Sequence, residues 1–174
     1  GTVEISPGYG LDWTLKIPKG VKVITRVEDH EDLENTLNFH TLYLGVSAED
    51  VTILMPPGTR WKKEYQGKRI GISDVSGTQD ILDFKEAMDR NPSAVSFRIN
   101  PLEYPKSLID FCKAEGIKTR GYSGFGGEVW AGYLGSIFPE SFLQAFGEEN
   151  VDLIILPSQD PYFLERALQI KPRK

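Results

Sequence analysis

Seven short apolar runs alternate along the chain with longer segments in which apolar residues recur every three or four positions. The runs are rich in β-branched residues and nearly continuous, as expected for strands that are buried on both faces of a sheet. We expect strands at residues 3–5, 22–27, 51–55, 68–73, 94–99, 117–122 and 151–156. Regular alternation of strands and helices predicts a parallel sheet with right-handed crossover connections.

The segments between the runs carry the periodicity of helices. Residues 29–44 place Leu33, Leu37 and Leu44 on one face, and residues 76–90 form the clearest amphipathic pattern. Gly116 follows a third periodic segment, where a left-handed residue often ends a helix. We expect helices over residues 29–44, 76–90, 108–115 and 128–146, the last interrupted at Pro139, and after residue 160.

The spacing of these units predicts the fold class. A strand and its helix take roughly 25 residues, which is dense for an open sheet and suits a compact barrel. No glycine-rich dinucleotide motif or phosphate-binding loop favours an open nucleotide-binding sheet. We therefore predict an α/β fold, a shortened (β/α) barrel of the TIM type with about seven parallel strands. It forms a single domain over residues 1–174, and the leading Gly1 is compatible with excision from a longer chain.

Composition limits the partners and the setting. The chain has 25 acidic and 20 basic residues, a net charge of -5, and its only basic run is residues 171–174, which argues against nucleic acid. No apolar run approaches the roughly 20 residues that span a bilayer, and the N-terminus does not resemble a signal peptide. We expect no membrane partner and a cytoplasmic location.

Three residues with reactive or metal-binding side chains are expected to have structural roles. Cys112 is the only cysteine and falls on the apolar side of a helix, so we expect a core residue in a reducing compartment. His30 and His40 are the only histidines, and no spacing pairs them as metal ligands. We expect both imidazoles to be exposed to solvent, with His40 on a helix surface.

The residues 111–127, FCKAEGIKTRGYSGFGG, resemble the aldo-keto reductase pattern FC…GI…YSPLG, in which a strand delivers an aromatic residue under the nicotinamide ring. Other segments resemble the same family in the same order, and together they cover nearly all the chain. They are ISPGYG at 5–10 (DTA..YG), KVITRV at 22–27 (a strand ending in TKV), 33–57 (LENSL..L...YVDLYLIHWP), GISD at 71–74 (GVSN) and 94–101 (a strand ending in His-Pro or Asn-Pro). The resemblance implies that the family's first strand, long substrate loops and C-terminal tail are absent.

The resemblance also implies a set of catalytic positions. Tyr9 matches the tyrosine that acts as general acid toward a carbonyl oxygen, and its ordinary pKa of about 10 must be lowered for work near neutral pH. Arg26 stands at the position of the activating lysine and Glu4 at that of its aspartate partner. Met55 stands at the position of the histidine that orients the carbonyl. The set is altered, because arginine does not replace lysine at a tight site and methionine donates no hydrogen bond.

The cofactor contacts implied by the resemblance are altered as well. Counterparts of the nicotinamide-binding set are Ser73, Asp74, Tyr122 and Ser123. Ser96 stands where the family has glutamine, and Tyr122 has an alternative role as an aromatic cap on a barrel strand. Residues 157–160, Pro-Ser-Gln-Asp, replace the basic motif that binds the 2′-phosphate of NADP. We therefore expect no tight cofactor binding unless the chain works as an NAD(P) enzyme.

Three functional hypotheses remain open. The first is a catalytically impaired domain that serves as a binding, assembly or regulatory module. Its open barrel edges, near residues 3–6 and 151–156, would be covered by a protein partner, a further chain segment or a second copy. The second is an NAD(P)H-dependent oxidoreductase that reduces a small carbonyl with the altered set. The third is an unrelated (β/α) enzyme using carboxylates such as Glu4, Asp74 and Glu103, although strand-end carboxylates are also ordinary helix caps.

Overall fold

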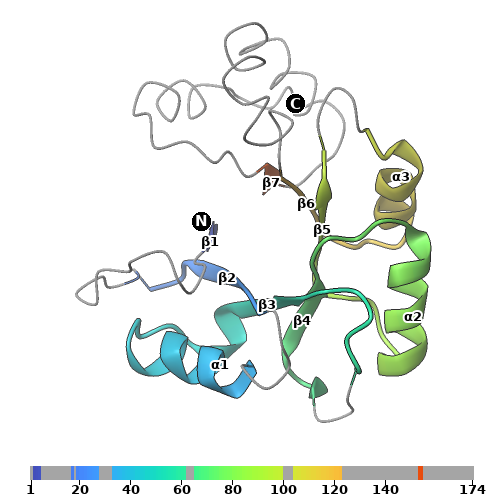
Figure 1. Cartoon of the computed structure of the whole chain (residues 1–174). Coiled ribbons are helices and arrows are strands. Elements are labelled where there is room, and N and C mark those ends of the chain that lie inside the picture. The colour runs from blue at the N-terminus through green and yellow to red at the C-terminus, as the bar shows by residue number, and fades with distance from the viewer. Residues whose placement is uncertain are drawn as a thin grey trace, which may run out of the picture. The chain divides into compact units, whose positions relative to one another are not determined.

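The computed structural model describes residues 2–4, 17, 19–27, 33–61, 65–99, 104–122 and 153–154. In this part of the chain the strands follow one another in the sheet in sequence order (Figure 1). The pairs β1–β2, β2–β3, β3–β4, β4–β5 and β6–β7 are all parallel. The strands are β1 (Thr2–Glu4), β2 (Lys22–Arg26), β3 (Val51–Met55), β4 (Arg69–Ile72), β5 (Val95–Arg98), β6 (Thr119–Tyr122) and β7 (Leu153–Ile154).

The helices lie between the strands, as the sequence pattern predicts. They are α1 (Leu33–Leu42), the short 3-10 helix η2 (Ala48–Asp50), α2 (Thr78–Met88) and α3 (Lys106–Ala114). The predicted parallel α/β alternation is therefore confirmed in the described residues. The helices predicted over residues 128–146 and after residue 160 lie outside those residues. The chain divides into two compact units, residues 1–95 and 96–174, and the prediction of one domain stays a prediction.

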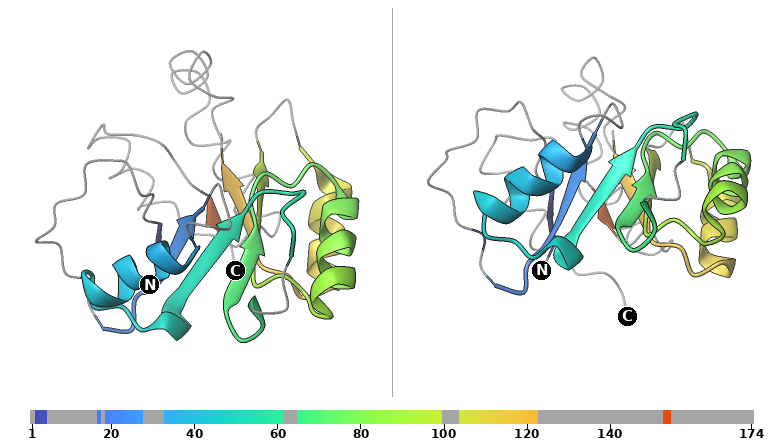
Figure 2. Two further views of the ribbon diagram at one scale, coloured as in Figure 1. Left: turned by 60° about the horizontal axis from the view of Figure 1, so that its bottom comes forward. Right: turned by 90° about the horizontal axis from the view of Figure 1, so that it is seen from below.

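In the first unit the register of the strands assigns residues to two faces of the sheet. Arg26 lies opposite Leu54, and Leu54 lies opposite Gly71, so these three residues share a face. We call it the Arg26 face, and the other, which carries Ile53 and Ile70, the Ile53 face. The side chains of the Ile53 face are almost all apolar and buried, as a face covered by helices requires. Figure 2 shows α1 lying along β2 and β3, and α2 beside β4.

Gly71 on the Arg26 face sits where no side chain fits. A Cβ atom built on Gly71 would lie 2.2 Å from the carbonyl oxygen of Ala94 and 2.7 Å from Cδ2 of Leu54. The Ala94 carbonyl is fixed, because it accepts a hydrogen bond of 3.0 Å from the Ile72 amide. Ile24, Leu54 and Ala94 form a small apolar cluster beside this glycine. Glycine therefore allows β4 and the start of β5 to approach closely.

The buried stripe of α1 includes His40, so the prediction that His40 is exposed is wrong. Leu33, Thr36 and His40 are buried and recur at helical spacing, whereas Leu42 and Tyr43 are exposed. The imidazole of His40 is fully buried, and its Nδ1 lies 2.7 Å from the carbonyl oxygen of Thr36, which can accept a hydrogen bond from it. The pKa of His40 is lowered by burial, which disfavours the charged form, and the hydrogen bond to Thr36 opposes this only in part.

The second unit contains α3 and the strands β6 and β7. α3 buries Leu108, Ile109 and Cys112, so the prediction of a core cysteine is confirmed. The helix ends before Gly116, whose φ of +66° is the left-handed conformation that the sequence predicts there. The Ile117 amide donates a hydrogen bond of 2.8 Å to the Cys112 carbonyl, which directs the chain into β6. None of the helices in the described residues is long and apolar enough to cross a membrane.

Burial of His40 makes stability depend on pH. With its pKa lowered in the folded state, the folded protein binds fewer protons than the unfolded chain below about pH 6.5, so stability falls as pH falls through that range. His40→Asn keeps a donor near the Thr36 carbonyl and does not titrate. Urea unfolding at pH 7.5 and 5.5 should show that the wild type loses up to about 1.4 kcal/mol more than this variant. An identical loss in both proteins would contradict the assignment.

Candidate functional site

The carboxyl ends of β2, β3 and β4 bring four of the predicted site residues to one edge of the first unit. Arg26 and Met55 are the last residues of β2 and β3, and Ser73 and Asp74 directly follow β4. Because the three strands are parallel and in register, these residues lie at the same end. This is the edge at which parallel (β/α) folds place their binding loops.

An ion pair joins Arg26 to Asp74 across the end of β3. The Arg26 Nη2 donates a hydrogen bond to the Asp74 Oδ2. Both side chains are partly exposed, 32% for Arg26 and 45% for Asp74, so solvent screens the pair. Asp74 has a φ of 53°, a left-handed conformation that aspartate tolerates better than most residues. A predicted catalytic residue and a predicted cofactor-binding residue are thus paired with each other.

The end of β3 offers no hydrogen-bond donor from its side chains. Leu54 is opposite Arg26 in register and shares its face, whereas Met55 lies opposite Ile72 and belongs to the other face. Both side chains are buried, Met55 completely. The resemblance to aldo-keto reductases assigns Met55 to the position of the histidine that orients the carbonyl. The strand register, however, brings Leu54 beside Arg26. Neither Leu54 nor Met55 has a side chain that could donate a hydrogen bond to a substrate carbonyl.

The remaining predicted residues are described to different extents. Ser73 is buried, and its amide donates a hydrogen bond of 2.8 Å to the Met55 carbonyl, which extends the β3–β4 ladder. Glu4 lies in β1 opposite Ile24. Tyr122 is half-buried at the end of β6, in the second unit. Tyr9 and Ser123 lie outside the described residues.

The sequence analysis did not predict the pairing of Arg26 with Asp74. The signal was present as opposite charges at the ends of strands separated by one strand. These charges predict a pair only when the register of the strands is known, because a shift of one residue would turn the Arg26 side chain to the other face of the sheet. Nothing in the described residues suggests a metal centre, since no three His, Cys, Asp or Glu side chains gather there.

The positive φ of Asp74 allows its two roles, ion pairing and backbone geometry, to be measured separately. Asp74→Asn removes the charge and should cost at most about 1 kcal/mol, because the pair is partly exposed. Asp74→Val adds a β-branched side chain at a left-handed residue and should cost roughly 1–3 kcal/mol more. Asp89, which also has a positive φ of 52°, provides the matched control Asp89→Val. Equal urea midpoints for both Asp74 variants would refute the strain at this position.

A known protein resembles this chain in sequence over most of its length. No family model matches the chain. It is 27% identical over 157 residues to a D-galacturonate reductase of Fragaria ananassa, an alignment that covers 87% of this chain and 44% of that protein. The chain therefore spans less than half the length of this relative.

Solved structures share the fold at lower sequence identity. An aldo/keto reductase from Brucella melitensis matches with a TM-score of 0.66 and 15% identity, over 96% of this chain and 77% of that one. A putative 2,5-diketo-D-gluconic acid reductase B matches with a TM-score of 0.69 and 14% identity, over 95% and 70%. The prediction of a shortened (β/α) barrel-like fold is thus confirmed. The chain is thus similar in fold to these aldo-keto reductase structures and in sequence to the D-galacturonate reductase, and it spans a part of each.

Proposed function

We propose that the chain is an aldo-keto-reductase-like domain whose carbonyl-reducing chemistry is impaired, and that it serves as a binding, assembly or regulatory module. The observation that carries this proposal is the ion pair between Arg26 and Asp74. The pair occupies two positions that the family resemblance assigns to catalysis and to cofactor binding. Each group is engaged by the other.

The ion pair weakens the support that Arg26 can give to a general acid. A cation lowers the pKa of a nearby phenol by stabilising the phenolate. The carboxylate of Asp74 is hydrogen-bonded to the guanidinium of Arg26. Its negative charge cancels much of the positive potential that Arg26 would otherwise exert on a phenol farther away. We therefore propose that Arg26 would lower the pKa of the Tyr9 phenol less than an arginine without an ion-pair partner would.

The apolar end of β3 also lacks the hydrogen-bond donors that would stabilise the charge on a reacting carbonyl oxygen. Reduction of a carbonyl places negative charge on its oxygen, and enzymes stabilise that charge with oriented donors. Loss of one such donor costs about 10²–10³ in rate in well-studied cases. Neither Leu54 nor Met55 can donate, so a reaction at this edge would proceed without that help.

The residues present also fit a nicotinamide poorly. A carboxamide presents both donors and an acceptor, whereas the carboxylate of Asp74 is already engaged by Arg26. The proposal accordingly includes no tightly bound cofactor and no step that passes through one. The partner is proposed to be a protein, a further chain segment or a second copy that pairs with β1 or β7. In the described residues each of these strands pairs on one side only.

One observation favours the alternative, an NAD(P)H-dependent oxidoreductase that reduces a small carbonyl. Arg26, Ser73 and Asp74 converge at the strand end where such a site is expected, and the sequence relative is named a D-galacturonate reductase. In that alternative Tyr9, Glu4 and Arg26 form an altered catalytic set.

A steady-state assay separates the two functions. Oxidation of NADPH and NADH by the purified chain is followed at 340 nm with D-galacturonate and with glyceraldehyde as substrates. We expect no oxidation that depends on both protein and substrate. Tyr9→Phe is the control, since it removes the general acid of the alternative. Substrate-dependent turnover that is lost in this variant would establish the oxidoreductase and overturn the proposal.

A further inference from the structure

Helix α1 distributes its polar and apolar side chains against the usual rule. Its buried side contains the polar residues Thr36 and His40 beside Leu33. On its solvent side, Leu42 and the following Tyr43 are 75% and 56% exposed, more than any other large apolar side chain in the described residues. A helix that covers a sheet normally turns such side chains inward. Their outward position is typical of a surface that another molecule covers.

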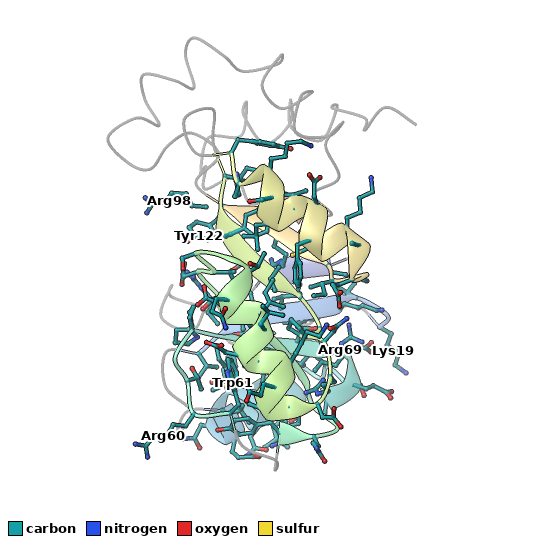
Figure 3. The ribbon with its side chains drawn as sticks, turned by 90° about the vertical axis from the view of Figure 1, so that its right-hand side faces the viewer. Lys19, Arg60, Trp61, Arg69, Arg98 and Tyr122 are labelled. Atoms are coloured by element: carbon teal, nitrogen blue, oxygen red, sulfur yellow. The ribbon has the colours of Figure 1, made fainter. Side chains whose placement is uncertain are left out.

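Leu42 and Tyr43 form one apolar patch with Phe39. The rings of Phe39 and Tyr43 stack, with centroids 5.7 Å apart and planes inclined by 28°. Leu42 follows Phe39 by three residues and so lies on the same side of the helix. We call these three residues the Tyr43 patch. By contrast, Trp61 in the same unit packs edge-on against Phe84 of α2, with ring centroids 4.7 Å apart, and Figure 3 shows it beside that helix.

The surroundings of the Tyr43 patch are acidic. The short helix η2, which packs against α1, carries Glu49 and Asp50. Glu49 accepts a hydrogen bond of 3.3 Å from the uncharged hydroxyl of Ser47. In the residues that the structure describes, neither carboxylate forms an ion pair, either with Lys22 of the neighbouring strand or with another cation.

Few cations offset these charges. Residues 28–59 contain no lysine or arginine. Lys68, directly before β4, reaches α1 and forms an ion pair with Glu34. Glu34 is in the first turn of α1, at the opposite end from Leu42. The carboxylates of η2 therefore set a negative potential around the Tyr43 patch.

We propose that the Tyr43 patch and the carboxylates of η2 dock a basic amphipathic helix of a protein partner. Charge complementarity selects this occupant, because its apolar side covers Leu42 and Tyr43 while its lysines or arginines meet Glu49 and Asp50. A second copy docked on the same patch would instead bring two acidic surfaces together, at a net charge of -5 for each chain. The inference goes beyond the proposed function, since a docking face on α1 is compatible with an active or an impaired strand-end site.

Fluorescence anisotropy of a labelled peptide titrated with the full chain tests the docking face. The probe is a synthetic amphipathic helix of leucine and lysine, about 18 residues long, and its counterpart has glutamate at every lysine. We expect saturable binding of the lysine peptide that weakens as salt is raised, and no binding of the glutamate peptide. Leu42→Ser should weaken binding about tenfold, whereas Leu82→Ser, which changes an exposed leucine of α2, should leave it unchanged.

Glu49→Gln separates the charge from the apolar contact. It should lower the affinity severalfold at low salt and leave it unchanged at high salt, while Leu42→Ser lowers the affinity in both conditions. Glu49 and Leu42 are exposed, so the urea midpoints of both variants should match the wild type.

Three results would overturn the docking face. The first is an absence of saturable binding of the lysine peptide, or equal affinity for the two peptides. The second is an equal loss of affinity in Leu42→Ser and Leu82→Ser. The third is a dimer in sedimentation that Leu42→Ser dissociates, because a second copy would then occupy the Tyr43 patch.

Discussion

The two-residue alternation of the parallel strands is the constraint on which the rest of this structure depends. One face of β2, β3 and β4 is filled almost entirely by apolar side chains, with Thr25 as the polar exception, whereas Arg26 lies on the opposite face. The close approach of β4 to the chain at Ala94 requires glycine at position 71, because any side chain there would collide with the Ala94 carbonyl. The same alternation decides that Arg26 is beside Leu54 and within reach of Asp74.

The Arg26–Asp74 pair matters more for chemistry than for stability. A partly exposed pair contributes at most about 1 kcal/mol to folding, which is small beside the burial of the apolar core. Under the proposed function its effect on a reaction is larger, because the resemblance to aldo-keto reductases implies a cation directed at a phenol and donors directed at a carbonyl. The pair redirects the cation, and the apolar end of β3 supplies no donor. On the proposed function, the fold keeps its shape while its site lacks the groups that drive reduction.

Much of the fold and part of the site could be predicted from the sequence. The strands and the helices α1, α2 and α3 were predicted because each local pattern agrees with its packing, and Gly116 took the predicted left-handed conformation. The burial of His40 was not predicted, because histidine is polar and the sequence does not show that its imidazole packs on the buried side of α1. The ion pair depends on register between strands, which the sequence pattern alone does not supply.

The central claim is that the Arg26–Asp74 pair and the donor-free end of β3 leave no functional nicotinamide site. Equilibrium binding of NADPH, followed by the fluorescence of the reduced cofactor, tests it most directly. We predict no saturable change for the wild-type chain up to millimolar cofactor. Saturable binding at micromolar NADPH that is weakened by Asp74→Ala would contradict the account.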